Sequence, residues 1–145
     1  YTRDVDAKLF ARAMLDAGKL NVTYRDRDNH VRILYYDTQY NDTFALMHQD
    51  AYEDAVPVSV QGLDASRLTV TLLAPVDLAV SKVSRFSAQD REDIRTLARE
   101  GLVTAKAFEH RAKQALPDYV GNLERVRNSI AIASKDIAAA GKRRR

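Results

Sequence analysis

The sequence predicts a single α/β domain of the α+β kind, with a small mixed β-sheet in residues 1–73 and a helical half over residues 74–140. Runs of β-branched and aromatic residues between turn formers lie in the first part. Patterns of helical period with capping residues fill the second part. A length of 145 residues allows one substantial core and is too short for two. Residues 141–145 form a basic tail.

The first expected element, residues 2–10, admits two interpretations. It is either a strand that carries Asp4 and Asp6 on one side, or the first turns of a helix capped by Thr2. The residues alone leave both open. Because the chain opens at Tyr1 inside this element, the sequence also admits the alternative that a preceding N-terminal segment is missing.

The next elements are a helix and a hairpin. Residues 11–17 are good helix formers, and Gly18 is a natural C-terminal stop. Residues 20–24 and 31–36 are rich in β-branched and aromatic side chains and flank a polar link, which predicts a β-hairpin. Residues 37–54 predict a loop or a short helix laid over the sheet.

A further strand and the first C-terminal helix meet at a proline. Residues 68–73 predict a strand that ends at Pro75, and residues 77–83 predict a helix that begins just after it. An inward stripe of this helix is expected at Leu78, Val83 and Phe86.

Three more helices follow. Residues 87–90 form a good N-cap with acidic residues in the first turn, so a helix is expected over 89–100 with its stop at Gly101. Thr104 starts another helix that ends near residues 116–117, and a last one covers residues 119–140. The apolar positions of this last helix recur at three- and four-residue spacings: Val120, Leu123, Val126, Ile130 and Ile137.

Composition excludes several classes of protein. With 46% hydrophobic and 30% charged residues the chain is ordinarily globular, and no apolar run approaches the roughly 18 residues of a membrane span. The absence of cysteine excludes disulfides and thiolate chemistry, and no secretory signal is visible. A cytoplasmic protein without a membrane partner is therefore expected. Much of the net charge of +3 lies in residues 142–145, which either touch nucleic acid or form a solvated end.

Three acidic residues are the first candidates for chemistry. In an extended segment Asp4 and Asp6 point to the same side, where two carboxylates can bind a divalent metal. In a helix they would simply favour its N-terminus. Asp37 ends an apolar strand and could complete an acidic triad, or it is a turn-forming residue, and Asp42 lies close enough to be confused with it.

The second candidate group is Lys82 with Asp90 and Asp93. A lysine on an otherwise apolar helix, faced by acids of the next helix, can hold a phosphate while a carboxylate orients the lysine. The alternative is a surface cluster of salt bridges. His30, His48 and His110 are scattered and predict no zinc site, and the sequence contains no phosphate-binding loop or dinucleotide fingerprint.

Taken together, these stretches resemble the nucleotidyltransferase-fold superfamily, in particular bacterial proteins of the abortive-infection and toxin–antitoxin type. Residues 73–82, followed by Arg85-Phe86 and by residues 90–97, are similar to that family's proline-acid-Leu helix with a lysine and its following Arg/Asp-x-x-Asp-Ile/Leu helix. Residues 2–6 look like its Thr-x-Asp-Val-Asp strand, and Asp37 is placed like its third carboxylate. The resemblance covers most of residues 1–116 and is strongest over 73–97.

The resemblance implies a set of site residues and a reaction. The implied catalytic residues are Asp4, Asp6, Asp37, Lys82 and Asp93. The implied nucleotide-contacting residues are Lys82, Arg85 and Asp90. The implied ligands of a Mg²⁺ ion are Asp4, Asp6 and Asp37. The reaction would transfer a nucleotidyl group from a nucleoside triphosphate to a hydroxyl of tRNA or of a protein, and a cognate antitoxin or toxin is the expected partner. The family's Gly-Gly or Gly-Ser turn would lie before Tyr1.

Three functional hypotheses therefore stand. The first is an active nucleotidyltransferase or toxin of that fold. The second is a non-catalytic, degenerate relative that serves as a binding module or an antitoxin-like interaction protein, with the helical half holding a partner. The third is a structural domain.

Overall fold

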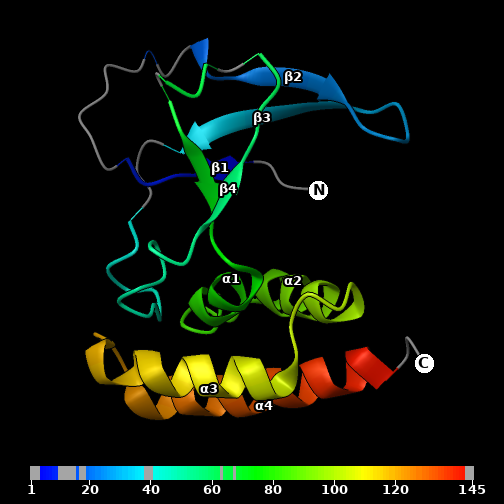
Figure 1. The fold of residues 1–145 in the computed structure, drawn as a ribbon. Coiled ribbons are helices and arrows are strands. Elements are labelled where there is room, and N and C mark those ends of the chain that lie inside the picture. Colours follow the sequence, from blue (N-terminus) through cyan, green and yellow to red (C-terminus); the bar gives the residue numbers. More distant parts are fainter. Residues whose placement is uncertain are drawn as a thin grey trace. The chain divides into compact units, whose positions relative to one another are not determined.

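A computed structural model describes residues 4–9, 16, 19–37, 41–62, 64–66 and 68–142, with the backbone alone at positions 4, 5 and 142. Its contacts divide the chain into unit 1, Tyr1–Asn41, and unit 2, Asp42–Arg145. Most of the helix predicted over residues 11–17, the predicted Thr2 cap and the end of the basic tail lie outside the described residues. Within the described residues all strands precede position 73 and all α-helices follow position 74, as the mixed α and β prediction requires (Figure 1).

Unit 1 contains a three-stranded sheet in the order β1-β3-β2. Strands β2 (Val22–Arg25) and β3 (Val31–Asp37) form the predicted antiparallel hairpin. Strand β1 (Asp4–Asp6) pairs with β3 in parallel, which decides between the two interpretations of this segment in favour of the strand. The sheet of unit 1 is therefore mixed.

The hairpin turn is organised by one side chain. The carboxylate of Asp26 accepts hydrogen bonds from the backbone N–H groups of Asp28 and His30 at 3.0 and 2.9 Å and from Arg32 Nε at 2.9 Å. Asn29 has a φ of 63°, a left-handed conformation that asparagine tolerates better than most residues. The polar link predicted between the two strands is therefore a turn built around Asp26.

Unit 2 contains a two-stranded antiparallel hairpin and the described helices. The hairpin strands are β4 (Val56–Val58) and β5 (Val70–Leu72), and the helices are α1 (Pro75–Ser81), α2 (Ala88–Arg99), α3 (Ala105–Ala115), the 3₁₀ turn η2 (Leu116–Asp118) and α4 (Leu123–Lys142). Strand β4 was not predicted, because a three-residue segment with Pro57 at its centre carries little strand signal. It forms because Val56, Pro57 and Val58 find partners in β5.

The ends of α2 and α3 confirm their local sequence signals. Ser87 and Asp90 form a reciprocal capping box at the start of α2. At its end Gly101 adopts a φ of 74°, and the N–H groups of Gly101 and Leu102 donate to the carbonyls of Ala98 and Leu97 at 3.0 and 2.9 Å. The Thr104 side chain caps α3.

Helix α4 begins four residues later than the pattern of apolar residues predicts. The side chain of Asn122 accepts a hydrogen bond from the N–H of Arg125 at 2.9 Å and so caps the helix just before Leu123. Val120 lies outside the helix and is 61% exposed, whereas Val126 and Ile137 are buried. The cap therefore decides where the helix starts.

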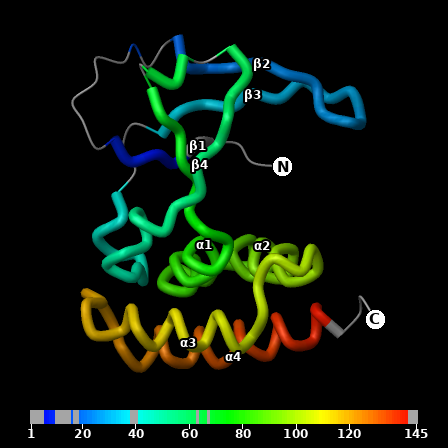
Figure 2. The backbone as a smooth tube through the Cα atoms, in the orientation of Figure 1, coloured from blue at the N-terminus to red at the C-terminus, as the bar shows by residue number. Residues whose placement is uncertain are grey.

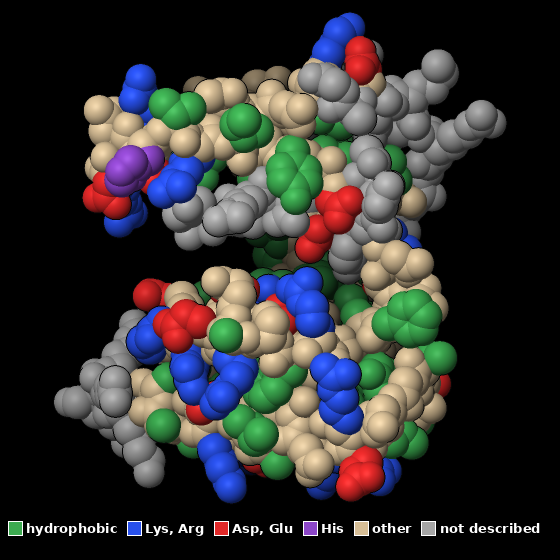
Figure 3. All heavy atoms as spheres, turned by 180° about the vertical axis from the view of Figure 1, so that it is seen from behind, with side chains coloured by type: hydrophobic (Ala, Val, Ile, Leu, Met, Phe, Trp, Pro, Cys, Tyr) green, Lys and Arg blue, Asp and Glu red, His purple; other side chains and the backbone are tan. Residues whose placement is uncertain are grey.

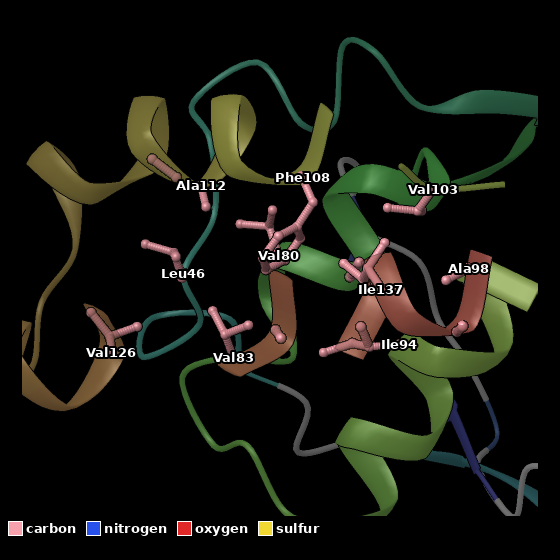
Figure 4. Packing of buried hydrophobic residues seen from close by; sticks show 14 residues of the cluster. Leu46, Val80, Val83, Ile94, Ala98, Val103, Phe108, Ala112, Val126 and Ile137 are labelled. Atoms are coloured by element: carbon pink, nitrogen blue, oxygen red, sulfur yellow. The ribbon is translucent and has the colours of Figure 1, made fainter. Parts of the chain in front are cut away.

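The core of unit 2 lies between its helices. Helix α1 packs on α3, α2 packs on α4, and α3 packs on α4 (Figures 1 and 2). Phe108 and Leu46 are the largest fully buried side chains and belong to the cluster of buried residues drawn in Figure 4. Leu46 comes from the segment predicted as a loop or short helix over the sheet. Residues 41–54 form turns, as the loop alternative predicted, and Leu46 packs against the helical core of unit 2.

The inward face of α1 differs from the prediction. Val83 is buried as predicted, but Leu78 and Phe86 are only half-buried, and Asp77, Ala79 and Val80 take the inward positions. Asp77 turns inward because Arg111 of α3 pairs with it, an interaction that no local pattern reveals. None of the described helices combines the length and the apolar character that crossing a membrane would require.

Candidate functional site

The predicted metal-binding acids meet on neighbouring strands of unit 1. In the parallel register of β1 and β3, Asp6 is the direct partner of Asp37 and Asp4 is the partner of Tyr35. Paired positions on adjacent strands lie about 4.8 Å apart and belong to the same face of the sheet. Asp6 is exposed and Asp37 is partly buried. The structure therefore brings Asp6 and Asp37 together, with Asp4 two positions earlier in β1.

Two neighbouring carboxylates suit a hard divalent cation. Mg²⁺ is commonly held by one or two carboxylates, with water and substrate phosphate oxygens filling its remaining positions. The pairing of Asp6 with Asp37 matches that donor set. The sequence predicted Asp4, Asp6 and Asp37 as candidate ligands, and the pairing of β1 with β3 makes Asp6 the register partner of Asp37.

A different cluster meets the geometric spacing for a metal among the described residues. Asp26, Asp28 and His30 each place one ligand atom within 4.8 Å of the others. The hydrogen bond from Arg32 is the largest influence on Asp26 and lowers the pKa of its carboxyl. Because Asp26 already accepts three hydrogen bonds that form the hairpin turn, a structural role accounts for this cluster.

The second predicted group assembles at the junction of α1 and α2 in unit 2. Lys82 Nζ donates to Asp93 Oδ2 at 2.8 Å and lies 3.9 Å from Asp90 Oδ1. Arg85 binds both oxygens of Asp90, with Nε and Nη2 at 2.8 and 2.7 Å. Gln89 Nε2 donates to the remaining oxygen of Asp93 at 2.8 Å. The structure therefore brings together Lys82, Arg85, Asp90 and Asp93.

The turn that joins these helices is held in an uncommon conformation. Phe86 has a φ of 52°, which a bulky residue rarely adopts. Its N–H donates to Lys82 O at 3.0 Å, and the guanidinium of Arg91 lies 5.5 Å from the centre of its ring. These contacts stabilise the sharp reversal that brings Lys82 opposite the start of α2.

Asp90 is the most perturbed carboxyl of this group. Burial alone would raise the pKa of Asp90, but hydrogen bonds from Arg85 and Ser87 outweigh it and lower the pKa from 3.8 to about 2. The side chain is 1% exposed, so its charge depends on these partners. Asp90 thus joins the helix cap to the ion pairs of the junction.

This pKa predicts how stability changes with pH. At neutral pH we expect Asp90→Asn to lower the free energy of unfolding by about 2 kcal/mol, because charge-assisted hydrogen bonds are lost. A depressed pKa means that the stabilisation is complete above about pH 4 and is lost as pH falls towards 2. Urea unfolding of the wild-type chain and of Asp90→Asn at pH values from 7 to 2 should therefore show a difference in the free energy of unfolding that narrows below about pH 4. A difference that stays constant down to pH 2 would contradict the lowered pKa of Asp90.

Sequence reasoning missed two ion-pair groups that join distant segments of unit 2. Arg111 of α3 binds the carboxylate of Asp77 in α1 and also contacts Asp54. Asp136 of α4 accepts hydrogen bonds from Arg91 and Arg95 of α2, each at 2.8 to 3.1 Å. Partners more than 30 positions apart leave no periodic signal in the sequence.

The predicted site residues fall into both units of the chain. Asp4, Asp6 and Asp37 belong to unit 1, and Lys82, Arg85, Asp90 and Asp93 belong to unit 2. Figure 3 shows several lysine and arginine side chains on one face of the helical unit.

Comparisons of the chain with protein-family models, with curated proteins and with solved structures found no match.

Proposed function

We propose that this chain is a nucleotidyltransferase that uses Mg²⁺ to transfer a nucleotidyl group from a nucleoside triphosphate to a hydroxyl of RNA, tRNA included, or of a protein. The observation that carries the proposal is the register of β1 and β3, which makes Asp6 the direct partner of Asp37. It is supported by the resemblance of residues 2–6 and 73–97 to the nucleotidyltransferase-fold superfamily. In a toxin–antitoxin system this enzyme is the toxin, and its cognate antitoxin is the partner class to seek.

Each residue has a role in this proposal. Asp4, Asp6 and Asp37 hold the metal ion, which when bound neutralises phosphate charge and polarises the phosphorus that is attacked. In unit 2, Lys82 is the residue that the resemblance assigns to phosphate contact, and Asp93 orients its ammonium group through the 2.8 Å hydrogen bond. Arg85 is assigned to the nucleotide by the resemblance, and the buried Asp90 orients the Arg85 guanidinium through two hydrogen bonds.

The direct test is transfer of label to RNA or protein. Incubation of the full chain with Mg²⁺ and tRNA should transfer label from an α-³²P triphosphate but none from a γ-³²P triphosphate, because only the α-phosphate stays with the transferred group. We expect Asp6→Asn to lower this transfer by about two orders of magnitude, since a metal Lewis acid contributes several kcal/mol and 1.36 kcal/mol is tenfold. Gel autoradiography of the RNA and of the protein measures both acceptors.

A matched control separates this site from the other acidic cluster. Asp28→Asn removes an exposed carboxylate of the hairpin turn and should leave transfer unchanged. Transfer that survives Asp6→Asn but is lost in Asp28→Asn would move the metal to the hairpin turn and refute the assignment to β1 and β3.

One observation favours the second hypothesis, a non-catalytic binding module. Lys82 and Arg85 are both engaged by carboxylates of α2, as in a purely structural junction. Titration calorimetry of the full chain with a triphosphate and Mg²⁺ distinguishes the two functions. Binding that is lost in Asp6→Asn supports the enzyme, whereas the absence of any heat of binding supports the module.

A further inference from the structure

The positive charge of the chain is concentrated in its C-terminal part. Residues 104–145 contain ten Lys and Arg residues and four Asp and Glu residues, so their net charge is +6, whereas residues 1–103 have a net charge of −3. Charge asymmetry of this size between two parts of a chain indicates binding of a polyanion. The helices of the basic part are α3, η2 and α4.

The described cations of the helical part of unit 2 differ in whether they are paired. Ion pairs with carboxylates engage six of them: Lys82, Arg85, Arg91, Arg95, Arg99 and Arg111. Arg125 donates to the backbone O of Arg85. Four exposed cations of α3 and α4 form no ion pair with any described residue: Lys106, Lys113, Arg127 and Lys135. We call these four residues the basic face.

A contact between α3 and α4 places the basic face on adjoining sides of the two helices (Figures 1 and 2). Glu109 lies three positions after one lysine of α3 and four before the other, so it shares their side of the helix. It accepts a hydrogen bond from Ser134 of α4. Arg127 precedes Ser134 by about two turns, and the exposed Lys135 follows it directly. The cations of each helix are therefore about 10–12 Å apart along its axis.

The acids of this part of the chain leave the basic face positive. Asp136 binds Arg91 and Arg95 of α2, so its charge is already compensated. The other three acids are Glu109, which binds Ser134, Asp118 in η2, and Glu124 in the first turn of α4. Because Glu109 lies between the cations, they form a spread row of charges rather than a pocket for one small anion.

We propose that the basic face binds the sugar–phosphate backbone of an RNA. Phosphates spaced along a strand match unpaired cations spaced along two helices, and phosphate and sugar contacts position most proteins on nucleic acids. The inference does not rest on the proposed function, because it uses only residues of α3 and α4.

The uncharged residues of the basic face favour RNA over other anionic partners. A membrane surface or an acidic protein would require large apolar side chains among the charges. Among the described residues of α3 and α4, however, only Leu123 and Ile132 are exposed large hydrophobic residues. Exposed His110, Gln114 and Asn128 accompany the cations instead. These side chains both donate and accept hydrogen bonds, which suits the ribose 2′-hydroxyl that distinguishes RNA from DNA.

The salt dependence of RNA binding tests the proposal. Fluorescence anisotropy of a fluorescein-labelled RNA stem–loop with the full chain, in buffer that contains EDTA, measures the affinity without any metal. Each cation bound to a phosphate adds about 0.7–0.9 to the slope of log K against log salt. We therefore expect the affinity of the wild-type chain to fall at least about 50-fold between about 50 and 200 mM salt. A smaller fall would show fewer than four phosphate contacts and would overturn the proposal.

A variant of the basic face locates these contacts. It combines four substitutions: Lys106→Gln, Lys113→Gln, Arg127→Gln and Lys135→Gln. We expect the slope to become shallower by about 3 and binding at about 100 mM salt to weaken at least about a hundredfold. Because all four side chains are exposed, the variant should keep the circular dichroism of the wild-type helices.

A matched control removes the same charge from exposed positions outside α3 and α4. It combines Lys19→Gln, Arg25→Gln, Arg27→Gln and Arg99→Gln. The slope should stay within about 1 of the wild-type value, because salt screens charges that lie more than about 10 Å from a phosphate. Equal slopes for the wild-type chain and the basic-face variant, or equal changes in the two variants, would refute the proposal.

Other probes separate RNA from the alternatives. A DNA stem–loop of the same sequence lacks the 2′-hydroxyl and should bind less tightly, so equal or tighter binding would refute the assignment to RNA. Co-sedimentation with phosphatidylserine vesicles without RNA binding would identify a membrane surface instead. RNA binding that survives in the basic-face variant but is lost when the arginines at positions 143–145 become glutamine would move the contact to the end of the chain.

These measurements also distinguish this inference from the proposed function. RNA binding in EDTA that depends on the basic face, in a chain that transfers no label, supports the inference and counts against nucleotidyl transfer. Label transfer to tRNA that depends on Asp6, with RNA affinity unchanged in the basic-face variant, supports the enzyme and refutes RNA binding by this face.

Discussion

Replacing Arg111 with alanine is expected to lower the free energy of unfolding of unit 2 by about 3–5 kcal/mol. The side chain of Asp77 is 1% exposed, and Arg111 Nε and Nη2 donate to its two oxygens at 2.6 and 2.9 Å. The hydrogen bond with Asp77 is also the main reason that the pKa of Arg111 is raised. Without Arg111, a buried carboxylate loses its counter-charge, which costs far more than the loss of an exposed ion pair.

Urea unfolding followed by circular dichroism at 222 nm measures this change, because the described α-helices all lie in unit 2. Arg127→Ala removes an exposed arginine of α4 and should change stability by less than about 0.5 kcal/mol. The double variant Asp77→Ala with Arg111→Ala should be no less stable than Arg111→Ala, since it leaves no unpaired charge. If Arg111→Ala lowers the free energy of unfolding by an amount within about 1 kcal/mol of that for Arg127→Ala, the buried charge of Asp77 does not depend on Arg111.

The second large effect is expected at the centre of the helical core. Phe108 is fully buried and packs with Val80, Ile137 and other members of the core cluster (Figure 4). Phe108→Ala should lower the free energy of unfolding by about 3–5 kcal/mol, because the lost burial and the cavity both contribute. Urea unfolding followed by circular dichroism at 222 nm measures this loss of stability.

The chain offers a control of the same residue type. Phe44 is 68% exposed in the turn segment that carries Leu46, and Phe44→Ala should cost less than about 0.5 kcal/mol. Similar losses for the two variants would contradict the burial of Phe108. A large loss confined to Phe108→Ala would confirm that the side chain of Phe108 lies in the core of this unit.

Predictions from sequence succeeded where the signal is local. The hairpin of β2 and β3 follows from two β-branched runs around a polar turn, and α2 begins after Ser87 and stops before Gly101 because both cap residues act on adjacent backbone. Where a local signal competed with another, the prediction was wrong by a few residues. The cap at Asn122 starts α4 later than its apolar pattern indicates.

The candidate site divides in the same way. Residue type and spacing identified Asp4 and Asp6 as a pair and Lys82 as the partner of acids in α2, and the contact of Lys82 with Asp93 is confirmed. Whether residues 4–6 are a strand or a helix stayed open, because three residues carry too little propensity to decide. Pairing with β3 decides it, and that pairing also makes Asp37 the neighbour of Asp6.

By itself the sequence determined that the described strands precede the described α-helices, and it determined the capped ends of α2 and α3 and the residue types available for chemistry. Each of these depends on hydrogen bonds or spacings within a few residues. Only the tertiary structure decided that Asp77 is buried against Arg111 and that β1 lies beside β3. Those contacts join residues about 30 positions apart, where their stability comes from burial and pairing that no local propensity encodes.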